Sequence, residues 1–359
     1  MVAMAPTFVH RHIREMIGYT PGEQPAPGDR VIKLNTNENP FPPSDQVALA
    51  LREIDGELLR RYPNPTADLF RAAAAKLLNL TPDMFLCGNG SDELLTIATR
   101  TFVAPGGKLA FPMPTYSLYP ILANIEEAAT VTVPWEENWC LPTAALLATK
   151  ADAIYLANPN APSGTFVSPT KMEELAKDFR GLLLIDEAYV DFADDNCVAL
   201  LRDCDNVVIT RTLSKAYSLA GLRFGYAIAQ PAVIAEMMKV KDSYNCDAIS
   251  MILATAAIND QEYARKNWDY VRSERQRVSA ELTQMGWDVL PSHANFILVT
   301  CPDGRGREAY LGLKRQGILV RFWDQPGLSD KIRITIGQNH QNNALLAGIK
   351  TLNAAEKAA

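Results

Sequence analysis

Short apolar segments separated by longer helical ones dominate much of the chain and restrict the folds open to it. The apolar segments KLAFP, ATVTVP, AIYLANP, GLLLIDEAY, NVVITRTLSK and FGYAIA begin at positions 108, 129, 153, 181, 206 and 224. Strands this short, with no polar face, are typical of a parallel sheet that helices cover on both sides. The pattern therefore predicts an α/β fold in which a large domain has a central, mostly parallel sheet flanked by helices.

The two ends of the sequence predict a second, smaller unit. Residues 19–44 hold too many prolines and glycines for regular structure, so we expect an extended arm there. Helical patterns follow at residues 46–60 and 66–80, and residues 261–287 form one long amphipathic pattern that leads into strands with polar ends and a closing helix. We predict an N-terminal arm that is part of the small domain (residues 1–45), a large domain (residues 46–258) and a small C-terminal α+β domain (residues 259–359).

Charge and composition exclude several classes of partner. The chain holds 35 Lys and Arg against 41 Asp and Glu, a formal net charge of −6, with no basic run that would follow a nucleic-acid backbone. No segment has the length of a membrane span, and the N-terminal residues lack the apolar core of a signal peptide. The 6 cysteines form no C-x-x-C pair and the 4 histidines form no metal-ligating cluster. We expect a cytoplasmic protein with free thiols, no metal, and no nucleic-acid or membrane partner.

Polar side chains gather directly after the apolar strands, which is where doubly wound sheets bind their ligands. Asp186 and Tyr189 follow one strand, and the sequence GNGSDE at positions 88–93 follows another and opens a helix. The strand around position 208 leads into Thr212, Ser214 and Lys215. A carboxylate, a lysine and a glycine-rich helix start are therefore expected at one edge of the sheet.

Each of these groups also has an ordinary structural explanation. Ser91 is a good helix N-cap, with Asp92 and Glu93 complementing the helix dipole, although a small-residue helix start also binds anions. Asp186 would cap a loop, bind a metal or pair with a buried cation. Lys215 is either a surface lysine or an amine placed to form a Schiff base. Arg223, with Thr212 and Ser214, is placed to hold a phosphate.

Eight motifs decide between these explanations. NENP, RYPNP, GNGSDE, PTYSLY, NPNAPSG, IDEAY, RTLSKAYSLAGLR and IRITIG occur in this order over residues 19–337. Together they resemble the fold-type I aminotransferases that depend on pyridoxal 5'-phosphate (PLP), and most closely their histidinol-phosphate branch. The resemblance implies a PLP-binding large domain of the fold predicted above.

The resemblance also implies a role for individual residues. Lys215 would form the Schiff base with PLP and shuttle the proton, Asp186 would pair with the pyridinium nitrogen, and Tyr189 would contact the phenolic oxygen. A carboxylate at the ring nitrogen keeps it protonated, so that the ring accepts electrons from the substrate carbon. The remaining cofactor-binding residues implied are Ser91, Asp92, Glu93, Tyr116, Thr212, Ser214 and Arg223, with Tyr116 stacked on the ring.

One position departs from the pattern of the family. An asparagine usually precedes the P-[ST]-G turn and supports the phenolic oxygen, whereas this chain has Ala161 there. Asn160 or Asn158 is expected to substitute for it, or Tyr189 to make the contact alone. An ordinary role for both asparagines is turn formation beside proline.

The resemblance further implies how the substrate and a second subunit bind. Arg333 is similar to the arginine that holds the substrate anion, and Arg321 and Tyr19 are similar to partners of a distal phosphate. Without the family, both arginines would be interpreted as strand-end residues in water. Tyr62 is similar to the tyrosine that reaches the cofactor phosphate of the neighbouring subunit, which implies a homodimer.

The expected activity is transfer of an amino group from L-histidinol phosphate to 2-oxoglutarate, which yields imidazole acetol phosphate and L-glutamate in histidine biosynthesis. One alternative is an aromatic-amino-acid aminotransferase of the same branch. A second is a PLP-dependent decarboxylase of a phosphorylated amino acid. A third, a regulatory protein that only senses PLP, would need a DNA-binding segment that the basic residues of this chain do not provide.

Overall fold

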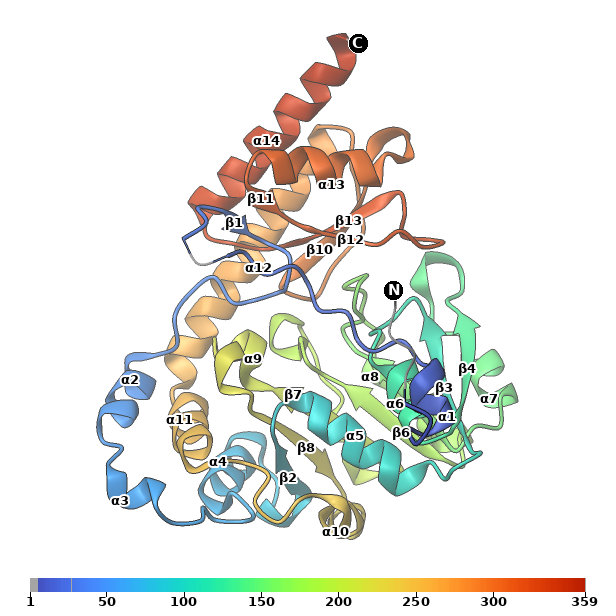
Figure 1. The fold of residues 1–359 in the computed structure, drawn as a ribbon, viewed down its shortest axis with the longest axis vertical. Coiled ribbons are helices and arrows are strands. Elements are labelled where there is room, and N and C mark those ends of the chain that lie inside the picture. Colours follow the sequence, from blue (N-terminus) through green and yellow to red (C-terminus); the bar gives the residue numbers. More distant parts are fainter. Residues whose placement is uncertain (1–5, 27, 359) are drawn as a thin grey trace.

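The computed structural model describes residues 6–26 and 28–358 and divides them between two layered units (Figure 1). Residues 1–5, 27 and 359, which belong to the predicted arm and small domain, lie outside the described residues. A 7-stranded sheet forms the larger unit, and a 4-stranded antiparallel sheet forms the smaller one. The predicted α/β fold is confirmed, while the residue boundaries of the domains stay a prediction.

The large sheet has the strand order β2-β8-β7-β6-β5-β3-β4. Its strands are β2 (Phe85–Gly88), β3 (Lys108–Met113), β4 (Ala129–Pro134), β5 (Ala153–Ala157), β6 (Leu182–Asp186), β7 (Val207–Thr212) and β8 (Gly225–Ala229). Within β6, Leu183 and Ile185 belong to one hydrophobic cluster and Leu184 to another. Successive side chains of a strand point to opposite faces, so a strand buried on both sides must be apolar throughout.

β8 is the exception to the parallel order, because it runs antiparallel to both β7 and β2. Thr212 at the end of β7 pairs with Gly225 at the start of β8. A parallel strand would need a long crossover to return to the other end of the sheet. The short connection between the two strands instead turns back at the carboxyl edge, and it carries Lys215 and Arg223.

Helices cover both faces of the large sheet (Figure 1). The helices of the larger unit are α4 (Asp68–Leu78), α5 (Ser91–Phe102), α6 (Tyr119–Ile125), α7 (Thr143–Ala148), α8 (Pro169–Asp178), α9 (Leu213–Ala216), α10 (Pro231–Val240) and α11 (Ala248–Asn259). Of these, α9 is a short helix after β7, and α11 packs on α4. The single helix predicted over residues 46–60 is divided into α2 (Asp45–Arg52) and α3 (Gly56–Leu59). Asp55 accepts a hydrogen bond from the backbone N–H of Leu58 at 3.0 Å and so caps a new helix in the middle of the predicted one.

The smaller unit is built on the long helix α12 (Gln261–Gln284), which lies between it and the larger one (Figure 1). Its antiparallel sheet has the order β12-β13-β10-β9. The elements are β9 (Asp288–Val289), β10 (Phe296–Thr300), α13 (Gly306–Arg315), β11 (Ile318–Leu319), β12 (Arg321–Phe322), β13 (Lys331–Thr335) and α14 (Asn339–Ala358). The segment 317–323, which reads as one of the predicted strands with polar ends, therefore forms two strands: β11, which pairs with the arm, and β12 of this sheet.

The N-terminal arm crosses from one unit to the other (Figure 1). It begins with α1 (Arg11–Glu15), which lies against α6, and it continues to β1 (Ile32–Lys33), which pairs in parallel with β11. The pairing with β11 ties the arm to the C-terminal unit, while α1 ties it to the larger one.

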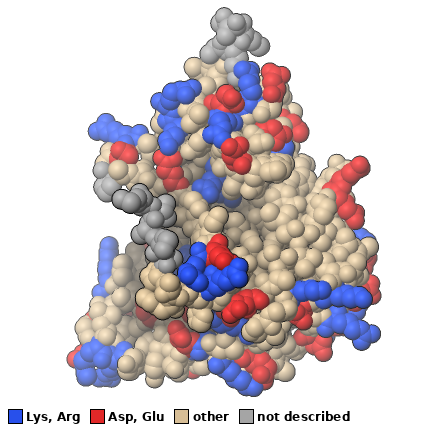
Figure 2. Space-filling view, turned by 45° about the vertical axis from the view of Figure 1, so that its right-hand side comes forward, with Lys and Arg blue, Asp and Glu red and all other residues tan. Residues whose placement is uncertain are grey.

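The surface in view carries both kinds of charged side chain. Figure 2 shows basic and acidic side chains interspersed over the face in view. None of the helices in the described part of the chain is long and apolar enough to cross a membrane.

Candidate active site

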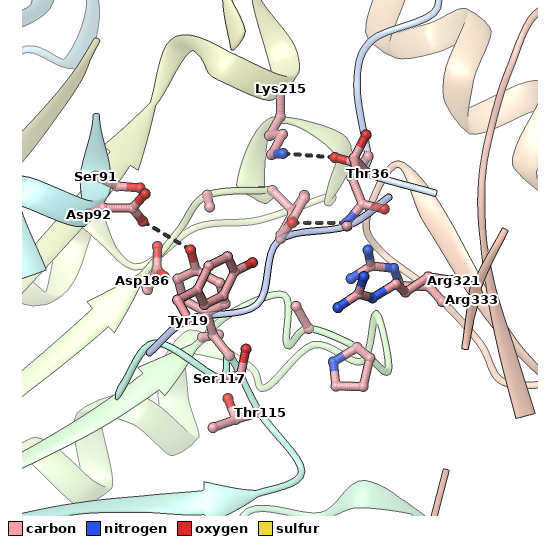
Figure 3. Close-up of a pocket in the computed structure, with 18 of the residues that line it drawn as sticks. Tyr19, Thr36, Ser91, Asp92, Thr115, Ser117, Asp186, Lys215, Arg321 and Arg333 are labelled. Atoms are coloured by element: carbon pink, nitrogen blue, oxygen red, sulfur yellow. Dashed lines mark hydrogen bonds between the residues drawn. The ribbon is translucent and has the colours of Figure 1, made fainter. Parts of the chain in front are cut away.

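A cavity of about 400 Å³ lies at the carboxyl ends of the large sheet, where the arm and the small domain close over it (Figure 3). Side chains from three parts of the chain line it, and Figure 3 shows Lys215 and Asp186 on its large-domain side with Arg321 and Arg333 together on the opposite side. The predicted site residues that line this cavity are Tyr19, Ser91, Asp92, Tyr116, Asp186, Tyr189, Thr212, Ser214, Lys215, Arg223, Arg321 and Arg333.

Asp186 is a buried carboxylate at the last position of β6, with 4% of its surface exposed. It accepts hydrogen bonds from the Tyr119 hydroxyl at 3.2 Å and the Thr210 hydroxyl at 3.3 Å, and among the described residues it has no salt-bridge partner. Burial raises its pKa to about 7, because the charged form has lost its water without gaining a cation. The carboxylate is therefore suited to a cationic ligand in the cavity.

Lys215 lies on α9, within the short connection between β7 and β8. Its Nζ donates a hydrogen bond to the carbonyl oxygen of Thr36 in the arm, at 3.1 Å. Burial, with Arg333 as a further cause, lowers the pKa of Lys215 to about 8. A large share of the amine is thus unprotonated near pH 8, which is the form that attacks an aldehyde.

A group of hydroxyls, backbone N–H groups and one guanidinium forms a cradle at the start of α5. Arg223 has a left-handed backbone conformation with φ 57°, and its guanidinium donates to Asp92 at 3.1 Å and to Ser214 at 3.4 Å. A side-chain carbon at Gly90 would come within 2.7 Å of this guanidinium. Glycine at position 90 therefore keeps the helix N-terminus and Arg223 close together, as an anion site requires.

Thr212 and Tyr116 complete this side of the cavity. The Thr212 hydroxyl accepts a hydrogen bond from the backbone N–H of Ser214 and donates to the Ser214 hydroxyl at 2.9 Å. The Tyr116 hydroxyl donates to Asp92 at 3.0 Å, and the ring of Tyr19 from the arm meets the Tyr116 ring edge-on at 6.1 Å. Burial raises the pKa of both tyrosines, so both are neutral hydrogen-bonding groups at physiological pH.

Two arginines face the cavity from the small domain without an acidic partner among the described residues. Arg333 on β13 donates to the carbonyl oxygen of Asn35 at 3.1 Å, and its buried Nε has no hydrogen-bond partner in the described chain. Arg321 on β12 donates to the arm carbonyls of Thr20 and Pro21 at 3.5 and 3.4 Å. Burial lowers the pKa of Arg333 to about 10, and the nearby Arg321 adds to the effect. The pair is arranged to bind an anion.

Trp323 is a cavity residue that the sequence did not indicate. The Arg321 and Arg333 guanidinium carbons lie 5.3 and 5.1 Å from the centre of its ring, and Arg333 is also 5.0 Å from the ring of Phe296. Aromatic rings at this distance attract a cation. Since Trp323 follows β12 outside every motif, only the folded chain places it against both arginines.

Three predicted residues lie outside the cavity lining. Glu93 accepts hydrogen bonds from the backbone of Asn89 and from Asn245, so it braces the loop beneath the cradle. The amide of Asn160 accepts from Thr115 at 2.9 Å and donates to Ser163 at 2.8 Å, which ties it to the turn. Tyr62 is 82% exposed and stacked on Tyr244 with 4.6 Å between ring centres.

Ala161 lines the cavity but offers no polar group. It packs with Ala294 and Phe296 against the ring of Tyr189. Asn158 lies outside the cavity lining, and its amide is bound at both ends to the backbone of Val167. Which residue takes the place of the usual asparagine stays a prediction, and Tyr189 is the polar side chain against which Ala161 packs.

The profile of the family described as aminotransferase class I and II matches residues 29–349 of the chain. The chain belongs to this family. It is 45% identical over 345 residues to histidinol-phosphate aminotransferase 1 of Trichormus variabilis, a match that covers 96% of this chain and 99% of the relative. It is 46% identical to the histidinol-phosphate aminotransferase of Rhodopirellula baltica over 94% of both chains.

Solved structures of this aminotransferase family give the same fold. The crystal structure of histidinol-phosphate aminotransferase from Sinorhizobium meliloti, in complex with pyridoxal-5'-phosphate, superposes with a TM-score of 0.90. It is 27% identical, and the match covers 98% of this chain and 99% of that one. The fold-type I architecture and the transaminase class expected from the motifs are confirmed.

Proposed function

We propose that this aminotransferase binds PLP and transfers the amino group of L-histidinol phosphate to 2-oxoglutarate, giving imidazole acetol phosphate and L-glutamate. The observation that carries the proposal is that Lys215, Asp186 and Arg223 meet in one cavity. The far side of this cavity holds Arg321 and Arg333, which have no acidic partner among the described residues. The relatives named histidinol-phosphate aminotransferase, which are 45% and 46% identical over nearly the whole chain, support the substrate.

The residues present fit the cofactor. Asp186 is a buried carboxylate without an ion-pair partner among the described residues, which suits a protonated ring nitrogen. Arg223, Ser214 and the N-terminus of α5 form a cradle suited to its phosphate. When bound, PLP supplies an aldehyde that condenses with amines and a ring that withdraws electrons from the substrate carbon.

The side chains of this chain would then hold the substrate and move its proton. Lys215, with its lowered pKa, would take the proton from the substrate carbon and return it. Tyr189 would donate to the phenolic oxygen of the cofactor. Arg333 and Arg321 would bind the anionic groups of the two substrates, since a guanidinium holds a carboxylate or a phosphate through two hydrogen bonds.

A donor panel tests the substrate. Purified protein is incubated with PLP and 2-oxoglutarate, and glutamate is measured with L-histidinol phosphate or L-phenylalanine as the amino donor. We expect turnover with L-histidinol phosphate to exceed that with phenylalanine by at least tenfold. Turnover of phenylalanine alone would replace the proposal with an aromatic aminotransferase, and CO₂ release without keto-acid formation would replace it with a decarboxylase.

We also propose that two copies of the chain share their active sites through Tyr62. The exposure of its stacked pair with Tyr244 supports a role outside its own subunit. Mixing inactive Lys215→Ala and Tyr62→Ala proteins under conditions that exchange subunits should restore activity, because each hybrid then has one intact site. If a mass measurement shows that hybrids have formed but activity does not recover, the sharing is contradicted.

We also propose a cytoplasmic location. The cysteines of the described chain are free, which fits a compartment where thiols stay reduced.

A further inference from the structure

Asn37 in the arm contacts the hydroxyl of Tyr189, although 152 residues separate them. Its Nδ2 donates a hydrogen bond to the Tyr189 oxygen at 2.9 Å. Asn37 is almost fully buried, with 1% of its surface exposed. Among the described residues, it is the only one hydrogen-bonded to the hydroxyl of Tyr189, because the side of the ring near Ala161 is apolar.

The orientation of the Asn37 amide is fixed by Thr335 at the end of β13. The Thr335 hydroxyl accepts a hydrogen bond from the backbone N–H of Asn37 at 3.0 Å and donates to its Oδ1 at 3.1 Å. In this arrangement the Thr335 hydroxyl uses its single hydrogen on Oδ1 while it accepts from the backbone N–H. The NH₂ group of Asn37 faces Tyr189, whose oxygen accepts.

The backbone at position 37 also favours asparagine. Its φ is 57°, in the left-handed region that asparagine, aspartate and glycine tolerate best. Asn295 donates to the carbonyl oxygen of Asn37 at 2.9 Å and holds this conformation from the small domain. Two small-domain side chains therefore fix one arm residue, and this arm residue contacts Tyr189 of the large domain.

We propose that Asn37 is a positioning residue that turns the hydroxyl hydrogen of Tyr189 into the cavity, toward the phenolic oxygen of the cofactor. A hydroxyl oxygen that accepts from Asn37 keeps its own hydrogen for another acceptor. This inference rests on the proposed function, since it needs PLP in the cavity. It assigns to the arm and small domain a direct influence on the cofactor, and it makes Asn37 the amide beside Tyr189, since position 161 is an alanine.

The visible absorption band of the bound cofactor provides a test that does not depend on turnover. A donor to the phenolic oxygen stabilises its negative charge, so loss of the donor raises the pH midpoint at which the band changes. Tyr189→Phe should raise this midpoint by about 1 to 2 pH units, as expected for one hydrogen bond to a charged group. Asn37→Asp should raise it by a similar amount, because a carboxylate accepts the Tyr189 hydrogen and turns it away from the cavity.

Asn37→Gly keeps the left-handed backbone but leaves the hydroxyl free to rotate, so the midpoint should rise by less. In a Tyr189→Phe background, Asn37→Gly should leave the midpoint unchanged. If Asn37→Asp does not fold, the comparison of Asn37→Gly in the wild-type and Tyr189→Phe backgrounds tests the role of Asn37 by itself. Asn79→Gly is the matched control, since Asn79 also has a left-handed backbone, with φ 54°, at the end of α4. Its midpoint should equal that of the wild type.

Three results would overturn the inference. The first is that Tyr189→Phe shifts the midpoint while Asn37→Asp and Asn37→Gly leave it unchanged and only lower the thermal stability of the protein. Another is an effect of Asn37→Gly that is as large in the Tyr189→Phe background as in the wild type. The third is a wild-type protein that develops no visible band with PLP, which would also end the proposed function; a normal band with unshifted midpoints would refute the role of Asn37 alone.

Discussion

Asp186 should destabilise the cofactor-free protein above neutral pH, and its replacement by asparagine should remove that cost. The folded-state pKa of Asp186 rises from 3.8 to about 7 because the carboxyl group is buried. Each whole unit of pKa corresponds to about 1.4 kcal/mol, so keeping this carboxylate charged costs about 4 kcal/mol. Between pH 4 and 7 the folded chain binds more protons than the unfolded chain, so stability falls as pH rises across this window and the whole cost is present above it.

The Asp186→Asn protein should therefore unfold later than wild type in urea at pH 8. We expect a gain of about 2 to 4 kcal/mol, where the lower value allows for weaker hydrogen bonds from Tyr119 and Thr210 to a neutral amide. At pH 5 the carboxyl group is mostly protonated in the folded wild type but ionised in the unfolded chain, so about 1.6 kcal/mol of the cost remains and the difference should shrink to less than about 2 kcal/mol. Asp242→Asn, at an exposed carboxylate, is the control and should change neither value.

Addition of PLP should reverse this order. A cation beside Asp186 removes the cost of its charge, so saturating PLP should stabilise the wild type more than Asp186→Asn. Urea midpoints followed by circular dichroism, with and without PLP at both pH values, give all the comparisons. The reasoning about the buried charge would be refuted if cofactor-free Asp186→Asn were less stable than wild type at pH 8. It would also be refuted if the gain in stability were the same at pH 5 and pH 8.

Three further predictions concern other residues of the site. Lys215→Ala should lose the yellow absorption band of the bound cofactor and essentially all turnover. In the wild type, the rate at which PLP reacts with the protein, measured by stopped-flow absorbance, should rise with pH up to about 8 and then level off. Arg223→Gln should weaken PLP binding about 10- to 100-fold in an equilibrium titration, since it removes a charged hydrogen-bond donor from the cradle; unchanged affinity would place the phosphate elsewhere. Trp323→Leu should raise KM for both substrates about 3- to 10-fold with little change in kcat, because the ring holds both guanidinium groups; a loss in kcat alone would contradict that role.

The sequence predicted the large sheet well because its strands, apart from the edge strand β4, are largely buried on both faces. Every apolar segment from position 108 to position 229 forms a strand, and Asp186 and Lys215 lie at the carboxyl edge where the strand pattern puts them. Burial on two faces leaves a signal that a single chain shows by itself. The break between α2 and α3 was missed because Asp55, which caps the second helix, looks like one more polar residue of an amphipathic pattern.

Local sequence could not resolve which polar side chain of a motif points into the cavity. Ala161 and Asn160 are neighbours in one tight turn, and the turn directs the alanine into the cavity while it binds the Asn160 amide to Thr115 and Ser163. Glu93 likewise follows two cradle residues but contacts Asn245, far away in the chain. Such directions depend on hydrogen bonds to residues that only the fold brings near.

The arm is the clearest case of a functional segment whose sequence gives little warning of its contacts. Within a few residues, the Asn35 carbonyl binds Arg333, the Thr36 carbonyl binds Lys215 and the Asn37 amide binds Tyr189. These three partners would respectively hold the substrate anion, move its proton and bind the cofactor. Because β1 fixes the arm to β11 of the small domain, any shift of that domain must move the hydrogen-bonding partners of all three groups together. Two backbone carbonyls and one side-chain amide in consecutive residues would therefore couple the position of the small domain to the chemistry at the large sheet.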